Sequence, residues 1–260
     1  MSLTVSAIPF TFDPLHTNHD YLDKIEDIIL KSPQNFVGVL PEYCWGALDQ
    51  ASVLENVDHV QGLLSQSQYM MLGSAPLDHN GAVYNSGILV GGNGLRKFYP
   101  KRNVLDEETK RGVVSGINPG VTMIGTLKVQ SVICADLWNA EYLLESVVND
   151  GIDLLLVPAF TAVPKGYSAY ARTQWHSLAL TRSREFIVPI VVADHYLHQP
   201  RYDVGQVTCI VDPSRKMESM KTIGDFMIHS PSEVISYEID FSNIEKYRNY
   251  RKNKGIYLSP

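Results

Sequence analysis

The chain has 260 residues, of which 45% are hydrophobic, and it carries a formal net charge of −6. This length suits one large domain or two small ones, and we predict a single domain over residues 1–260. The charge balance is acidic and includes no basic run, which argues against nucleic acid or an anionic membrane surface as a partner.

The three cysteines stand far apart, at positions 44, 134 and 209. This spacing fits neither a disulfide framework nor a metal-binding motif, so we expect no metal and a reducing compartment. The opening residues lack the basic start and apolar core of a signal peptide, and every apolar run is shorter than a membrane span. We therefore expect a soluble cytoplasmic protein that needs no cofactor.

The first part of the chain alternates predicted strands with predicted helices. Apolar runs indicate strands over residues 3–8, 36–40 and 69–73, and helical periodicity indicates helices from about residue 19 and over residues 50–66. The run at 36–40 is apolar throughout, which is typical of a strand covered on both faces. Glu42 follows it directly after Pro41.

The middle of the chain has the pattern of a hairpin. Turn residues at 78–81 and 91–94 flank predicted strands at 82–90 and 96–99, so that Lys101 stands at the exit of the hairpin. The glycine-bearing residues 112–120 are predicted to form a loop over the site. The GGNG sequence at 91–94 lacks the Lys-Ser/Thr pair and the following helix of a phosphate loop, which disfavours a nucleotide site.

The stretch 128–141 places a cysteine at the end of a strand. Residues 128–133 are predicted as a strand, Cys134 follows it, and Asn139 is suited to cap the next helix. Open N–H groups in such a turn, and the positive end of a helix, favour a thiolate and later an oxyanion. A lone cysteine is more commonly a small buried hydrophobe, so its position alone leaves both readings open.

The last part of the chain continues the alternation. We predict strands over residues 153–157, 187–193, 206–211 and 233–239 and a long helix over residues 168–186. Phe160 and Thr161 follow the strand at 153–157 and should lie at the same sheet edge as the earlier strand ends. Strands alternating with helices, followed by antiparallel strands, indicate a layered α/β fold.

Three segments together resemble the nitrilase superfamily of carbon–nitrogen hydrolases. They are FVGVLPE, which ends at Glu42, FYPKRNV, which contains Lys101, and VICADLWNAE, which contains Cys134. Each segment is weak alone, but three in the family's order form a specific signal. The resemblance covers nearly the whole chain and implies a four-layer α-β-β-α sandwich with a Glu-Lys-Cys catalytic site at strand ends.

The resemblance also assigns roles that the chemistry of these groups supports. Glu42 would accept the proton of the Cys134 thiol, and Lys101 would stabilise negative charge together with the backbone N–H of Ala135. Outside this context, Glu42 would be a surface carboxylate and Lys101 part of a solvated charged run. Asp136 is expected to orient the turn by hydrogen bonds.

The family often places a second Glu a few residues after the lysine to position water or substrate. Glu107 and Glu108 both fit, and the sequence does not choose between them. Ala135 replaces the family's usual aromatic residue, and Asn103 replaces a common His. The Cys-x-Asp pattern resembles the amidase branches, including ω-amidases, so we expect a small amide rather than a nitrile as substrate.

Other functions remain open at this point. An N-acyltransferase would use the same thioester, and an inactive relative would only bind a small molecule. A glutamine amidotransferase would need a synthetase domain that this sequence lacks. In the resembling family, C-terminal tails and the helix after the cysteine often pack against a second subunit, so residues 244–260 predict a homodimer or larger homo-oligomer.

Overall fold

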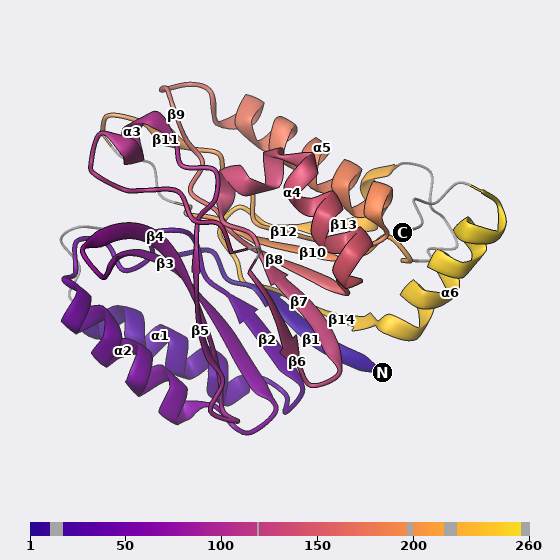
Figure 1. Cartoon of the computed structure of the whole chain (residues 1–260), viewed down its shortest axis with the longest axis horizontal. Helices are drawn as coiled ribbons and strands as arrows, with labels where there is room; N and C mark the ends of the chain where they lie inside the picture. Colours follow the sequence, from indigo (N-terminus) through magenta and orange to yellow (C-terminus); the bar gives the residue numbers. More distant parts are fainter. Residues whose placement is uncertain (11–17, 119, 197–199, 216–222, 256–260) are drawn as a thin grey trace.

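The computed structural model describes residues 1–10, 18–118, 120–196, 200–215 and 223–255. Within these ranges two six-stranded sheets lie face to face, and helices cover both outer faces (Figure 1). The predicted four-layer α-β-β-α sandwich is therefore confirmed. None of the helices in these ranges has the length and apolar character needed to cross a bilayer.

The first sheet has the strand order β14-β1-β2-β3-β4-β5. Neighbours β1, β2 and β3 run parallel, whereas β14, β4 and β5 each run antiparallel to the strand beside them. Helices α1 (Asn18–Lys31) and α2 (Gln50–Leu63) cover its outer face (Figure 1). The strand bounds are β1 Ser2–Ala7, β2 Phe36–Val39, β3 Gln68–His79, β4 Ala82–Gly91, β5 Arg96–Pro100 and β14 Ile235–Asp240.

The second sheet has the order β13-β12-β10-β8-β7-β6, with β7, β8 and β10 parallel. Helices α4 (Ala140–Glu145) and α5 (Ser168–Phe186) cover its outer face (Figure 1). A short pair, β9 (Ala162–Val163) and β11 (Asp203–Val204), stands apart from both sheets. The remaining bounds are β6 Val121–Ile124, β7 Leu127–Ser131, β8 Leu154–Pro158, β10 Ile190–Ala193, β12 Cys209–Val211 and β13 Met227–His229.

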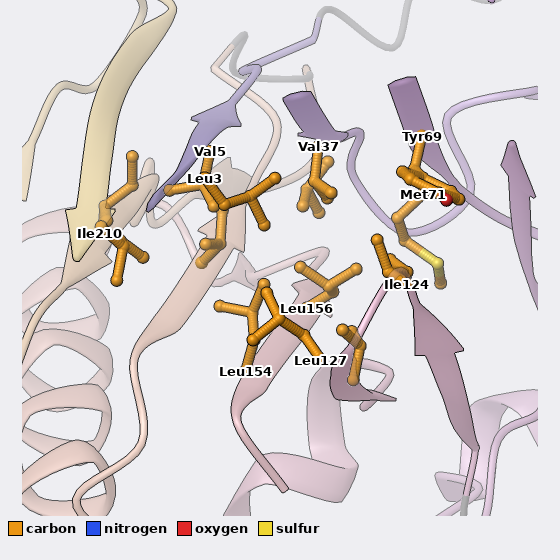
Figure 2. Packing of buried hydrophobic residues seen from close by; sticks show 14 of the residues in the cluster. Leu3, Val5, Val37, Tyr69, Met71, Ile124, Leu127, Leu154, Leu156 and Ile210 are labelled. Carbon is orange, nitrogen blue, oxygen red and sulfur yellow. The ribbon is translucent and has the colours of Figure 1, made fainter. Parts of the chain in front are cut away.

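Alternate residues of the central strands supply two different cores, which explains their unbroken apolar sequences. Val37 and Val39 of β2 point into the core between the sheets, whereas Phe36 and Leu40 pack under the α1/α2 layer. Strand β8 divides its side chains in the same way between the inter-sheet core and the α5 side. Figure 2 shows both sheets contributing to the inter-sheet core, through Leu3, Val5, Val37, Tyr69, Met71, Ile124, Leu127, Leu154, Leu156 and Ile210.

Several element boundaries differ from the sequence-based expectation. Strand β3 does not end at residue 73 but continues to His79, because Gly73 adopts a φ of +61° at an irregular step and pairing with β4 then resumes. The strand expected from residue 187 begins at Ile190, because Ile187, at φ 51°, ends α5. Likewise β12 begins at Cys209 rather than at residue 206, and α2 ends at Leu63 rather than at residue 66.

Two helices were not predicted from the sequence. The short α3 (Asp106–Thr109) follows Lys101, and α6 (Phe241–Asn253) contains much of the predicted interface tail. Arg248 anchors α6 to its own chain through the carbonyl oxygens of Ile187 and Ile152, at 3.0 and 2.8 Å. Residues 256–260 of the predicted tail lie outside the described residues.

Candidate active site

The three predicted catalytic residues follow strands that end near one edge of the sandwich. Glu42 follows β2, Lys101 follows β5, and Cys134 follows β7. The Glu42 N–H donates to the carbonyl oxygen of Ala159, beyond β8 in the second sheet, at 3.2 Å. This bond joins the two sheets at the edge where parallel strands bring their carboxyl ends together.

Lys101 is buried between two carboxylates. Its Nζ lies 2.8 Å from Glu42 Oε1 and 2.8 Å from Glu108 Oε2. Lys101 is 1% exposed and Glu42 is 2% exposed, so neither belongs to the solvated surface that their charge alone would suggest. A buried charge requires such pairing, because an unpaired ammonium would lose its hydration without compensation.

The lysine backbone is also fixed by its neighbours. Its N–H donates to Asn85 O at 2.8 Å, and its carbonyl accepts from Gly116 N–H at 2.8 Å. The second bond places the predicted loop 112–120 against the backbone of Lys101. Residue 119 of that loop lies outside the described residues.

The structure brings Glu108, and not Glu107, to the lysine. Glu108 is 7% exposed and accepts hydrogen bonds from Lys101, from the Tyr43 hydroxyl at 2.6 Å and from Leu105 N–H at 2.9 Å. Glu107 faces solvent on the other side of α3 and pairs with Lys110 at 2.7 Å. The sequence left open which of Glu107 and Glu108 lies near Lys101. The orientation of α3 decides this, because the face that carries Glu108 turns inward.

Asn85 is a member of this cluster that the sequence analysis missed. Its Nδ2 donates to Glu42 Oε1 and to Glu108 Oε1, each at 2.8 Å, from the buried part of β4. The sequence feature that could have pointed to Asn85 is its position as a polar residue inside the strand predicted at 82–90. Tyr43 also belongs to this cluster, because its hydroxyl donates to Glu108.

The charges in this cluster shift one another's protonation. Burial raises the pKa of Glu42, Lys101 lowers it and Glu108 raises it, with a net result above the usual 4.5. Burial also raises the pKa of Glu108, but Lys101 and the hydrogen-bond donors around this carboxyl outweigh burial and hold the pKa below its usual range. Burial lowers the pKa of Lys101, but the negative charges around it dominate and keep it protonated.

Cys134 stands at a sharp turn that opens a 3-10 helix (Cys134–Trp138). Its φ of 45° is unusual for a residue with a side chain and marks local backbone strain. Burial raises the pKa of the Cys134 thiol, the Glu42 charge raises it further, and Lys101 opposes the change only in part. The resting group is therefore a protonated thiol, and its Sγ donates to the carbonyl oxygen of Phe160 at 3.8 Å.

Asp136 connects the lysine segment to the cysteine turn. Its carboxylate accepts the backbone N–H groups of Arg102, Asn103 and Ile133. The Asn103 side chain donates in turn to the carbonyl oxygen of Ala135 at 2.9 Å. These bonds fix the segment after β5 relative to the turn that carries Cys134.

Solved structures share this architecture over nearly their whole length. A CN-hydrolase superfamily protein from Xanthomonas campestris, with an arsenic adduct in its active site, superposes with a TM-score of 0.77 at 15% identity, covering 100% of this chain and 98% of that chain. Nit3 of Saccharomyces cerevisiae, a member of branch 10 of the nitrilase superfamily, gives a TM-score of 0.77 at 16% identity over 96% and 94%. The chain has the nitrilase fold.

A third structure of this fold is an amidase from Nesterenkonia sp. AN1, in which acrylamide has added to the active-site cysteine of a mutant. It gives a TM-score of 0.67 at 16% identity and covers 98% of this chain and 99% of that chain. No sequence-family model matches the chain, and no curated protein matches it by sequence. The likeness to the nitrilase fold is therefore carried by structure.

In this nitrilase fold a cleft of about 400 Å³ opens beside Cys134. The predicted positioning residues Ala135, Phe160 and Thr161 all line it. Thr161 is held from behind by Asp194, which accepts both its N–H and its hydroxyl. Among the residues that the structure describes, no cluster of three or more His, Cys, Asp and Glu side chains could hold a metal ion.

His195 was not predicted to belong to the site. It follows β10 and is 1% exposed, and its Nε2 lies 2.7 Å from the Glu42 carbonyl oxygen. The N–H and the carbonyl of Glu42 are therefore both bonded to the second sheet. Burial lowers the pKa of His195 to about 4, so at neutral pH the ring is uncharged and donates from Nε2.

Proposed function

We propose that this protein is a carbon–nitrogen hydrolase that cleaves a small amide through a thioester on Cys134. The observation that carries the proposal is the buried group of a carboxylate, an ammonium and a thiol, supplied by three separate strand ends, with Lys101 Nζ 2.8 Å from Glu42 Oε1. In this proposal the Cys134 thiol is the nucleophile, and the Glu42 carboxylate, whose charge acts on the thiol, is the base that it needs.

In the first half of the proposed reaction, Glu42 accepts the thiol proton as Sγ bonds to the amide carbon. The carbonyl electron pair moves to oxygen, and two donors stabilise this oxyanion: Lys101 and the N–H of Ala135. Two of the three ammonium donors already bond to Glu42 and Glu108, which leaves the third for the oxyanion. Glu42 then gives its proton to nitrogen, the C–N bond breaks, and ammonia or an amine leaves.

In the second half, water replaces the amine. Glu42 accepts a proton from water as its oxygen bonds to the thioester carbon, and the C–S bond breaks with return of a proton to Cys134. A carboxylic acid is released, so that the sum is amide plus water giving acid plus ammonia or amine. Because the resting thiol is protonated, Glu42 must accept its proton for Sγ to attack.

An amide, including an ω-amide, remains our proposed substrate in preference to a nitrile, on the Cys-x-Asp pattern at residues 134–136. An amine in place of water would make the same thioester an N-acyltransferase. A binding protein without activity is the other alternative. We also propose a cytoplasmic location, because Cys44, Cys134 and Cys209 are all free thiols.

The direct test measures ammonia release from a panel of ω-amides, aliphatic amides, carbamoyl compounds and nitriles. We expect one amide class to be hydrolysed and Cys134→Ala to lower its turnover by about 10⁴-fold or more, because the nucleophile is lost. Cys209→Ala is the matched control, since Cys209 is equally buried but lies in β12 under α5. It should keep wild-type turnover per folded molecule.

Other outcomes would redirect the proposal. Wild-type turnover in Cys134→Ala would show that the nucleophile is misassigned. Formation of an N-acyl product when an amine is added, at the expense of the free acid, would favour the transferase. Absence of turnover, together with a Cys134 alkylation rate that Glu42→Gln leaves unchanged, would favour the binding protein, because the base would then have no function.

A further inference from the structure

The cleft beside Cys134 has aromatic walls from three separate segments. Trp138 comes from the 3-10 helix, Trp175 from α5 and Phe160 from the segment after β8. The rings of Trp138 and Trp175 meet edge to face, with centroids 5.9 Å apart. Cys134 lies in the same cleft, so an acyl group attached to its sulfur would lie against these rings.

Part of this apolar surface is exposed to water. Trp138 is 43% exposed and Leu105, across the cleft, is 50% exposed, whereas Trp175 is 7% exposed and packs into the core. Large apolar side chains on a concave surface gain free energy when a ligand covers them. Trp138 and Leu105 can therefore contact a substrate, whereas the buried Trp175 packs against Trp138 and supports it.

The polar side chains of the cleft already have protein partners. Asn103 donates to Ala135 O at 2.9 Å, Gln174 donates to the Tyr170 hydroxyl at 2.6 Å, and the Thr161 hydroxyl donates to Asp194. Among the described residues, those that line the cleft carry no formal charge. A substrate carboxylate placed here would lose its hydration without gaining a cation.

The catalytic cluster adds a second disadvantage for an anionic acyl group. Two carboxylates, Glu42 and Glu108, share the single ammonium of Lys101, so that the cluster offers no excess positive charge. The charge of Arg111 acts on Tyr43 and Tyr202, but Arg111 is not among the residues that line the cleft.

Resting on the proposed function, we infer that the cleft selects an uncharged, apolar acyl group, with Trp138 as the residue that determines this specificity. Amides whose acyl chain ends in a methyl or phenyl group should be the good substrates. Amides whose chain ends in a carboxylate, as in ω-amides of dicarboxylic acids, should be poor ones. This narrows the broad amide class to which the sequence pointed.

The test compares hexanamide with its carboxylate-ended counterpart of the same chain length, adipamate. We expect kcat/KM for hexanamide to exceed that for adipamate by at least about tenfold. Trp138→Ala should lower the ratio of kcat/KM for hexanamide to kcat/KM for acetamide by about tenfold, because acetamide has no chain that could cover the indole ring. Tyr167→Ala is the matched control, because Tyr167 is an exposed aromatic residue, at 55%, outside the cleft lining. Tyr167→Ala should leave kcat/KM unchanged for both hexanamide and adipamate.

A second measurement separates this inference from the proposed hydrolysis. Cys134 is alkylated with two chloroacetamides that carry an N-hexyl or an N-carboxypentyl group, and intact mass gives both rates. Faster labelling by the hexyl reagent, lost in Trp138→Ala, supports the inference even if no amide is hydrolysed. Preference for adipamate and the carboxylate reagent, abolished by Arg111→Gln and insensitive to Trp138→Ala, would overturn it.

Discussion

At the scale of single residues, the site is built around a shared ammonium. Lys101 holds Glu42 and Glu108 in fixed positions by bonds of 2.8 Å, and Asn85 bridges the same two carboxylates. Lys101, the two carboxylates and the Asn85 amide are all buried, so each depends on the others for its hydrogen bonds. The charge states of Lys101, Glu42 and Glu108 depend on one another for the same reason. Removing one should therefore change both the stability and the protonation of the rest.

The raised pKa of Glu42 predicts where activity is lost in acid. Glu42 must be ionised to accept the thiol proton, so kcat/KM should be full above its raised pKa and fall as pH drops through it, at a pH higher than 4.5. The pKa of Lys101 lies above its usual 10.5, so this ammonium should not cause an alkaline loss below that pH. A pH profile of kcat/KM checks this, and an acid limb at or below 4.5 would contradict it.

Glu108→Gln should impair both rate and stability. Breaking the buried ion pair should lower the free energy of unfolding by about 3 kcal/mol and kcat/KM by about 10²-fold. Loss of the Glu108 charge, which raises the pKa of Glu42, should also move the acid limb to lower pH. Urea unfolding and pH profiles provide the measurements.

Glu107→Gln is the matched control for that variant. Glu107 is adjacent in the sequence, but its side chain is exposed and pairs with Lys110 at the surface. We expect its rate, pH profile and urea midpoint to match those of the wild type. Equal losses in the two variants would show that the inward face of α3 has been misassigned.

At the scale of elements, the Pro41-Glu42 turn is shaped by the irregular step in β3. Gly73 has a φ of +61°, and a Cβ at this position would lie 1.9 Å from Pro41 O and 2.6 Å from Cys44 Sγ. The next residue, Ser74, accepts the Tyr43 N–H through its hydroxyl at 3.2 Å. The step in β3 thus makes room for the turn and holds it, which fixes the position of Glu42.

Gly73→Ala should therefore destabilise the protein and displace Glu42. Left-handed strain and overpacking together should lower the free energy of unfolding by about 3 kcal/mol or more. Gly81→Ala is the control, because Gly81 also has a positive φ, of +83°, but has nothing within 4 Å of a new Cβ. That variant should lose only about 1 kcal/mol and keep its turnover. Equal urea midpoints for the two variants would refute the packing explanation.

At the scale of the whole molecule, the site exists only when the two sheets are packed together. Glu42 belongs to the first sheet, yet its backbone bonds to Ala159 and His195 of the second sheet. Cys134, which follows β7 of the second sheet, lies close enough to Glu42 for the carboxylate charge to act on its thiol. The inter-sheet core therefore sets the alignment of Glu42 and Cys134, the proposed base and nucleophile, which no single sheet could provide.

The predicted homodimer also belongs to this scale and stays a prediction. Light scattering should give about twice the chain mass of 29.1 kDa. If α6 lies at the subunit interface, Tyr250→Glu should shift the mass towards that of one chain, because Tyr250 is 55% exposed on this helix. Tyr167→Glu, at an equally exposed aromatic position outside α6, should not shift the mass. A monomer mass for the wild type would contradict the prediction.

The sequence by itself determined the layered α/β fold and the order of the three strand ends. Apolar runs such as 36–40 and 153–157 are local signals, and a strand covered on both faces must be apolar throughout. The helix expected over residues 168–186 matches α5. The segments around Glu42, Lys101 and Cys134 also needed no contact information to be noticed.

Only the tertiary structure decided which side chains meet. Glu107 and Glu108 are equivalent in sequence and differ only in the face of α3 that turns towards Lys101. Asn85 and His195 reach Glu42 from β4 and from beyond β10, across 43 and 153 residues of chain. The Asn85 contact depends on strand pairing within the first sheet, whereas the His195 contact depends on how the two sheets pack. The burial that raises the pKa of Cys134 is likewise a product of the folded chain. Local sequence patterns predict neither these contacts between distant residues nor the burial of Cys134.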